Sequence, residues 1–153
     1  MNNPMELHIS TRHVLLDDYP WVEMSPGLET RVLQARPDEQ MIMMQTRAHP
    51  GAVSTLHRHL GPVFGLTQKG AWGHHPDVFP FKPGSYICEP LNELHRFHNG
   101  PDISEIFFVY HGDVEIMDES GREVLGRSNA ATALAHYLQQ CEQLGLPRPN
   151  VLN

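Results

Sequence analysis

The sequence predicts an all-β protein, a jelly-roll barrel that carries one C-terminal α-helix. Thirteen prolines and twelve glycines divide the 153 residues into short segments. Roughly nine or ten of these segments have the apolar content of strands and follow one another at hairpin spacing, which is typical of a barrel or jelly roll. From residue 128 onward the apolar residues change to a helical period.

The barrel core is expected over about residues 28–125, between turn signals such as Ser25-Pro-Gly27 and Gln68-Lys69-Gly70. Its strand candidates are residues 28–34, 40–47, 51–59, 63–67, 71–74, 84–89, 94–98, 105–111, 114–117 and 123–125. The helix is expected over about residues 129–144, because Ser128 or Asn129 can cap its start and Gly145 with Pro147 ends it. It would cover an open end or edge of the barrel, or serve a dimer interface.

The charge, the apolar content and the cysteines argue against several classes of partner and location. A net charge of −7 argues against a nucleic-acid or anionic-membrane partner, and no apolar run approaches the ~20 residues that span a membrane. The two cysteines form no spaced motif, which favours a reducing compartment. With no signal peptide visible at the start, we expect one cytoplasmic domain over residues 1–153.

The histidines suggest a metal site. His57 and His59 are separated only by Arg58. On a strand, residues i and i+2 point to the same face, so the two imidazoles can converge on one ion. On a helix they would diverge by roughly 200° and could not share a metal. A third ligand must come from elsewhere in the chain, and His95 is the candidate.

These spacings resemble the two motifs of the cupin superfamily, whose fold is a double-stranded β-helix. The first motif is matched by Gly51, His57, His59 and Gly70, and the second by Gly84, Pro90, His95 and Asn99. Val63 stands where the first motif has a glutamate, and Asn92 where the second has its middle glycine. The resemblance therefore implies a three-histidine metal site without the usual carboxylate, and a homodimer or homotetramer as is common among cupins.

A finer resemblance links residues 45–125 to the acetylacetone dioxygenase and 2,4'-dihydroxyacetophenone dioxygenase group. It is carried by Arg58 to Val63, Gly84 to Tyr86, Glu89-Pro90 and the turn from Asp118 to Gly121. This resemblance implies an Fe(II) enzyme that uses O₂ to cleave a carbon–carbon bond beside a ketone. Three neutral imidazoles leave the metal charge uncompensated, which favours an anionic enolate ligand. Imidazole also suits Zn, Ni and other transition metals, so the purified protein can carry one of these instead.

Other residues are candidates for supporting roles. Glu89 is expected to orient a ligand histidine or to act as a pocket carboxylate. The expected pocket walls are Val63, Phe64, Trp72, Tyr86, Phe97, Phe108 and Tyr110, with core packing as the alternative for each. The sequence leaves open whether His74, His75, Asp77 or His98 joins the site.

Two other functions compete with the dioxygenase. A non-enzymatic zinc module similar to the cupin domain of ChrR-type anti-sigma factors would also use a histidine cluster, but no second domain with a zinc motif is evident. A sugar-modifying cupin is the third possibility, and the scarcity of arginines near the site argues against phosphorylated substrates.

Overall fold

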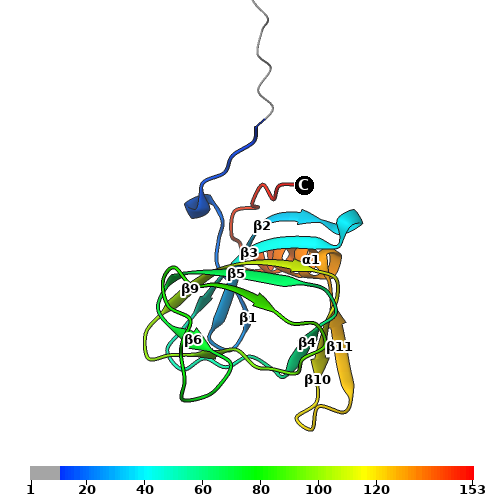
Figure 1. Ribbon diagram of the computed structural model, residues 1–153. Coiled ribbons are helices and arrows are strands. Elements are labelled where there is room, and N and C mark those ends of the chain that lie inside the picture. The colour runs from blue at the N-terminus through cyan, green and yellow to red at the C-terminus, as the bar shows by residue number, and fades with distance from the viewer. Residues whose placement is uncertain (1–10) are drawn as a thin grey trace, which may run out of the picture.

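The computed structural model describes residues 11–153 and confirms a β-rich fold with one C-terminal helix (Figure 1). The first ten residues of the expected domain lie outside the described part. The largest sheet has six strands in the order β1-β2-β3-β9-β5-β7. Its strands are β1 Val22–Ser25, β2 Leu28–Arg36, β3 Met41–Ala48, β5 Val63–Lys69, β7 Tyr86–Glu89 and β9 Ser104–His111. Short 3-10 helices, η1 Leu16–Asp18 and η2 Pro37–Glu39, lie before β1 and between β2 and β3.

Two smaller sheets complete the fold. One has the order β11-β10-β4 and the other pairs β6 with β8. Their strands are β4 His57–His59, β6 Trp72–Gly73, β8 His98–Asn99, β10 Val114–Met117 and β11 Val124–Ser128. The predicted strands over 51–59 and 94–98 are therefore wrong in extent. Only their last residues pair regularly, because residues 51–55 and 91–94 form turns and loops.

The helix α1 spans Ala130–Gln143, within two residues of the predicted bounds. Asn129 caps it: its side chain accepts a hydrogen bond from the backbone N–H of Thr132, and the Thr132 hydroxyl accepts one from the Asn129 N–H. Its apolar face packs on the sheet at β1 to β3, where Tyr137 and Cys141 are buried with Val32 (Figure 1). Within residues 11–153, no helix combines the length and apolar character that a membrane crossing requires.

The main hydrophobic core is formed by side chains of several strands and of the loops between them. Its buried residues are Leu28, Ala48, Ala52, Val63, Trp72, Phe97, Ile106 and Phe108. Buried and partly exposed residues alternate along β9, where Ile106 and Phe108 are both buried. One face of the six-stranded sheet thus forms the wall against which the site is built.

Two motif positions have backbone conformations that explain the residues found there. Gly70 has a φ of +72°, and a Cβ atom at this position would lie 2.2 Å from the hydroxyl oxygen of Ser104, so only glycine fits. Asn92, which replaces the motif glycine, has a φ of 62°. Asparagine tolerates this left-handed region better than most residues, so the substitution preserves the turn.

The turn between β10 and β11 is stabilised by the side chain of Asp118, and the size of this stabilisation should vary with pH. Its carboxylate accepts hydrogen bonds from the backbone N–H groups of Arg122 (2.8 Å) and Glu123 (2.9 Å) and from the Ser120 hydroxyl. These bonds lower the pKa of Asp118 from 3.8 to about 2. The stabilisation is therefore complete above pH 4 and is lost as the pH falls toward 2.

We expect Asp118→Asn to reduce the free energy of unfolding more at pH 6 than at pH 3. Urea unfolding of both proteins at the two pH values measures the difference. A loss of stability of the same size at both pH values would show that the ionised form of Asp118 has no special role.

Candidate metal centre

The position of the histidine pair is set by strand β4 and by the residue between the two histidines. His57 and His59 lie on the inner face of β4, and both line the cavity. Arg58 points to the opposite face, where its guanidinium contacts Glu115 at 2.6 Å. Arg127 of β11 contacts the other carboxylate oxygen of Glu115 at 2.7 Å. These charge-assisted bonds hold β4, β10 and β11 in register and so fix the direction of both imidazoles.

Backbone hydrogen bonds hold His95 next to this histidine pair. The N–H of His57 donates to the carbonyl of His95 at 3.1 Å, and the N–H of His95 donates back to the carbonyl of His57 at 3.0 Å. The ring centroids of the three histidines lie 4.5 to 5.1 Å apart. One nitrogen of each lies within 4.8 Å of the others, so the three residues form a group that can hold a metal ion.

The hydrogen bonds of the rings leave the right atoms free for a metal. The Nδ1–H of His57 donates to the carbonyl of Thr55 at 2.8 Å, and that of His95 to the carbonyl of Glu93 at 3.1 Å. The Nε2 lone pairs of both rings then face the cavity, which is how backbone carbonyls orient ligand histidines. The Nε2 atoms of His59 and His95 are buried without any hydrogen-bond partner. Buried nitrogens without partners are costly, and a divalent metal would satisfy them.

Protonation favours metal binding at His57. Burial, with a smaller contribution from the neighbouring histidines, lowers the pKa of this imidazole to about 4. His57 is therefore neutral at physiological pH and offers its lone pair. At His95, burial lowers the pKa, but the contributions of Glu89 and Glu93 together raise it by more, so the net shift is upward. Because a ligand imidazole must be neutral, this upward shift of the pKa works against metal binding.

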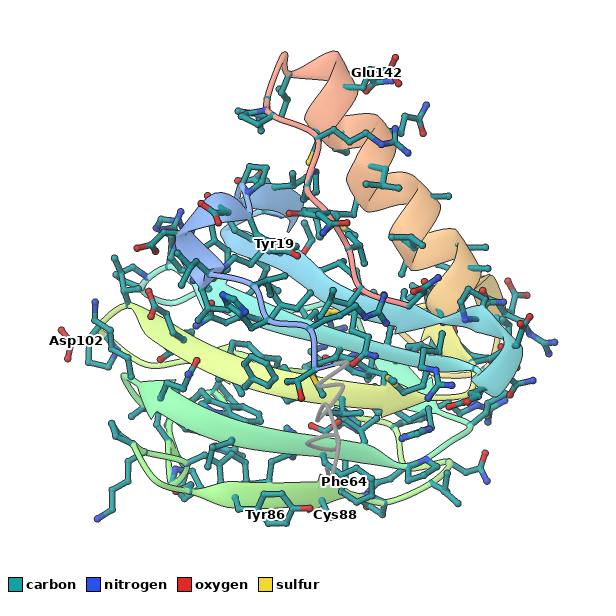
Figure 2. The ribbon with its side chains drawn as sticks, turned by 90° about the horizontal axis from the view of Figure 1, so that it is seen from above. Tyr19, Phe64, Tyr86, Cys88, Asp102 and Glu142 are labelled. Atoms are coloured by element: carbon teal, nitrogen blue, oxygen red, sulfur yellow. The ribbon has the colours of Figure 1, made fainter. Side chains whose placement is uncertain are left out.

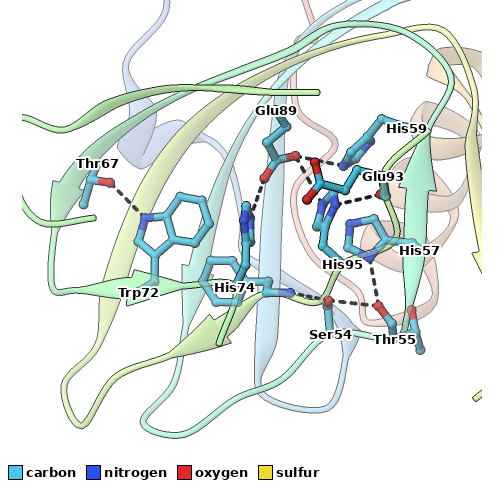
Figure 3. Close-up of polar contacts among 11 residues, drawn as sticks. Ser54, Thr55, His57, His59, Thr67, Trp72, His74, Glu89, Glu93 and His95 are labelled. Atoms are coloured by element: carbon cyan, nitrogen blue, oxygen red, sulfur yellow. Dashed lines mark hydrogen bonds and ion pairs between the residues drawn. The ribbon is translucent and has the colours of Figure 1, made fainter. Parts of the chain in front are cut away.

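Glu89 is buried beside the three histidines, and the more exposed His74 also contacts it (Figure 3). One carboxylate oxygen, Oε2, lies 2.9 Å from the Nε2 of His59 and 3.5 Å from the Nε2 of His95. The first contact is off the direction of a hydrogen bond, since the His59 nitrogen has no hydrogen-bond partner. The other oxygen, Oε1, is hydrogen-bonded to the Nε2 of His74 at 3.0 Å. Glu89 lies in the cavity wall, and its expected role, as an orienting partner of a ligand histidine or as a pocket carboxylate, stays a prediction.

The site opens into a cavity of about 260 Å³. Three of the predicted wall residues line it: Phe97, Phe108 and Tyr110. Its remaining walls come from β1 to β3, from β10 and from the start of α1, including Met24, Ile42, Met44, Ile116 and Ala133. Burial raises the pKa of Tyr110, so its hydroxyl stays protonated beside the His59 ring at neutral pH.

The other four predicted wall residues lie elsewhere. Val63 and Trp72 are fully buried in the core cluster and do not line the cavity. Phe64 and Tyr86 stack on each other on the outer face of β5 and β7, where Tyr86 is 68% exposed (Figure 2). Adjacent strand residues point to opposite faces, so Phe64 cannot share the inward direction of Val63.

Of the four undecided residues, only His74 joins a possible ligand group, with Glu89 and His95. His75 and Asp77 bond locally in the loop, and His98 pairs with Gly73. His74 is a polar contact of the site that the sequence left open. It lies two residues after the buried Trp72, just past the end of β6, and this closeness to a core aromatic is a signal that could have identified it.

Comparison with known proteins identifies the family. Residues 10–115 match the family model described as the ChrR cupin-like domain. The chain belongs to this cupin family. No curated protein matches the chain.

Solved cupin structures share the fold of this ChrR-like cupin. An RmlC-like cupin protein from Ralstonia eutropha is 20% identical over 95% of this chain and 96% of its own, with a TM-score of 0.82. An acetylacetone dioxygenase from Acinetobacter johnsonii is 19% identical over 92% of this chain and 99% of its own, with a TM-score of 0.74. The anti-sigma factor ChrR of Rhodobacter sphaeroides, solved with SigE, is 16% identical over 63% of this chain and 50% of the matched one, with a TM-score of 0.53. At these identities, the likeness establishes the fold alone.

Proposed function

We propose that this cupin is an Fe(II)-dependent dioxygenase that cleaves the carbon–carbon bond beside a ketone in a β-diketone or hydroxy-acetophenone. The observation that supports it most is the group of three histidines, whose Nε2 atoms converge at the wall of a largely apolar cavity. Similarity in fold to an acetylacetone dioxygenase adds support. In the reaction, each carbon of the broken bond gains one atom of O₂, and an α-hydrogen of the ketone becomes the proton of the acid product.

In this proposal, one set of residues binds the metal and another contacts the substrate. His57, His59 and His95 would hold Fe(II), which when bound supplies Lewis acidity toward a ketone oxygen and a site for O₂. Phe97 and Phe108 present apolar surface to the body of the substrate and exclude water. The Tyr110 hydroxyl, protonated at neutral pH, can donate a hydrogen bond to a substrate oxygen.

The proposal is tested by O₂ consumption. Protein purified without oxygen and loaded with Fe(II) should consume one O₂ per molecule of at least one ketone in a panel of β-diketones and hydroxy-acetophenones. The same protein loaded with Zn(II) is the control and should consume none, because zinc has no redox chemistry. If the Fe(II) protein consumes no O₂ with any member of the panel, the dioxygenase proposal for this substrate class is wrong.

A zinc-binding sensor module is the second candidate, favoured by the match to the ChrR cupin-like family. It predicts preferential binding of Zn(II) over Fe(II), no O₂ consumption, and no change in the spectrum of a bound Co(II) probe when ketones are added. A ketone-dependent change in that spectrum would instead favour an enzyme whose substrate binds at the metal.

A further inference from the structure

Glu89 lies at a position that the histidine motifs do not include. It is the last residue of β7, the edge strand of the six-stranded sheet, and it pairs directly across from Val63 of β5. Tyr110 of β9 pairs with Val63 from the other side. The three side chains form a row on the inner face, and Glu89 is the one acidic member. Its side chain is only 6% exposed.

The contacts of Glu89 are those of a metal ligand rather than of an outer partner. An outer carboxylate usually accepts the N–H of a ligand histidine on the side away from the metal. Here the Nδ1 atoms of His57 and His95 already contact backbone carbonyls. Glu89 Oε2 instead approaches the metal-facing Nε2 atoms of His59 and His95, at 2.9 and 3.5 Å. Two ligands of one ion lie at about such distances, since metal–ligand bonds are ~2.0–2.2 Å long.

The buried carboxylate of Glu89 requires a positively charged partner. A buried carboxylate is costly unless it is paired. Within residues 11–153, Glu89 forms ion-pair contacts with histidines but with no lysine or arginine. A divalent ion beside Oε2 would provide the missing positive charge.

His74 fixes the direction of this carboxylate. Its Nε2 contacts Oε1 at 3.0 Å, which leaves Oε2 to face the other histidines. The His74 ring itself packs edge-on against Trp72 and Phe81, with centroids 5.6 Å away in both cases. Ligand carboxylates are commonly held in this way by a hydrogen bond to their second oxygen.

We propose that Glu89 is a fourth protein ligand of the metal held by His57, His59 and His95, and that His74 is its positioning residue. The carboxylate that the first motif lacks at Val63 would then come from the paired strand, at the position directly opposite. One carboxylate offsets one of the two metal charges, so an enolate still meets a net positive site. The proposal rests on the metal centre of the proposed function but not on its reaction.

Metal affinity tests the ligand role without any activity assay. Competition with a chromophoric chelator gives the Kd for Co(II) and Zn(II), and the visible spectrum of bound Co(II) reports its coordination. We expect Glu89→Gln and Glu89→Val to weaken binding by more than ~100-fold and to alter the Co(II) spectrum, because loss of an outer partner alone costs roughly 10- to 100-fold. His74→Ala should weaken binding by a smaller factor. Glu23→Gln, the same substitution at an exposed site on β1, is the matched control and should leave both readouts unchanged.

The double variant Val63→Glu with Glu89→Val moves the carboxylate to the facing position. Directly opposed residues have Cβ atoms about 4.5–5.5 Å apart, so the new carboxylate can reach the same ion. We expect it to recover at least tenfold of the affinity lost in Glu89→Val, with circular dichroism confirming that both variants are folded.

Two results would overturn the ligand role of Glu89. The first is that both single Glu89 variants keep the metal affinity and the Co(II) spectrum of the wild-type protein. The second is that the double variant is folded but binds metal as weakly as Glu89→Val does. Either result is compatible with O₂ consumption by the wild-type protein. Conversely, metal binding that depends on Glu89 in a protein that consumes no O₂ would refute the proposed reaction and leave the ligand role intact.

Discussion

His59→Ala is expected to abolish tight binding of divalent metals and, with it, O₂ consumption. His59 is 2% exposed, and its Nε2 is buried with no hydrogen-bond partner. Alanine removes a ligand whose direction is fixed by the β4–β10 pairing and so breaks up the three-histidine group. Loss of an outer partner already costs 10- to 100-fold in affinity, so loss of the ligand itself should cost more than ~100-fold.

His98→Ala provides the control for this variant. His98 follows His95 by three residues but pairs with Gly73 in the small sheet β6-β8, outside the ligand group. Its replacement should leave the Kd for Zn(II), measured by competition titration, within threefold of the wild-type value. If His59→Ala binds metal as tightly as His98→Ala does, the three-histidine group is not the binding site.

The strand period was enough to predict the histidine pair. The i, i+2 spacing of His57 and His59 fixes their shared face wherever β4 lies in the fold. The helix was also predictable, because the Asn129 cap and Gly145 mark its ends by local rules. Spacing from neighbouring motif residues placed His95, and the backbone bonds with His57 now show how it arrives.

The contacts of Glu89 could not be predicted from local sequence patterns. Its place opposite Val63 follows from the register between β5 and β7, two strands that residues 70–85, including β6, separate in the sequence. The outward direction of Phe64, in contrast, was predictable from Val63 alone. Many of the remaining cavity walls lie on β1 to β3 and at the start of α1. Periodicity shows that such residues are apolar, but not which of them surround a shared space.

Trp72→Ala is expected to lower the free energy of unfolding by about 3–5 kcal/mol, the usual range when a buried large aromatic is truncated. Trp72 is 0% exposed, so the change leaves a cavity in the main core. Its ring stacks on Phe97 with centroids 4.8 Å apart, and its Nε1–H donates to the Thr67 hydroxyl at 2.9 Å. Truncation also leaves this hydroxyl without its donor. Urea unfolding monitored by far-UV circular dichroism measures the change.

The second tryptophan provides a matched comparison within the same chain. The guanidinium groups of Arg31 and Arg47 lie over the ring of Trp21, 4.3 and 4.4 Å from its centroid. Trp21→Ala loses two cation–π contacts but no fully buried core volume, so we expect a loss of only ~1–2 kcal/mol. An equal loss in both variants would mean that Trp72 does not anchor the core. Because Trp72 also supports the His74 ring, its alanine variant should weaken metal binding at temperatures where the protein is still folded, whereas Trp21→Ala should not.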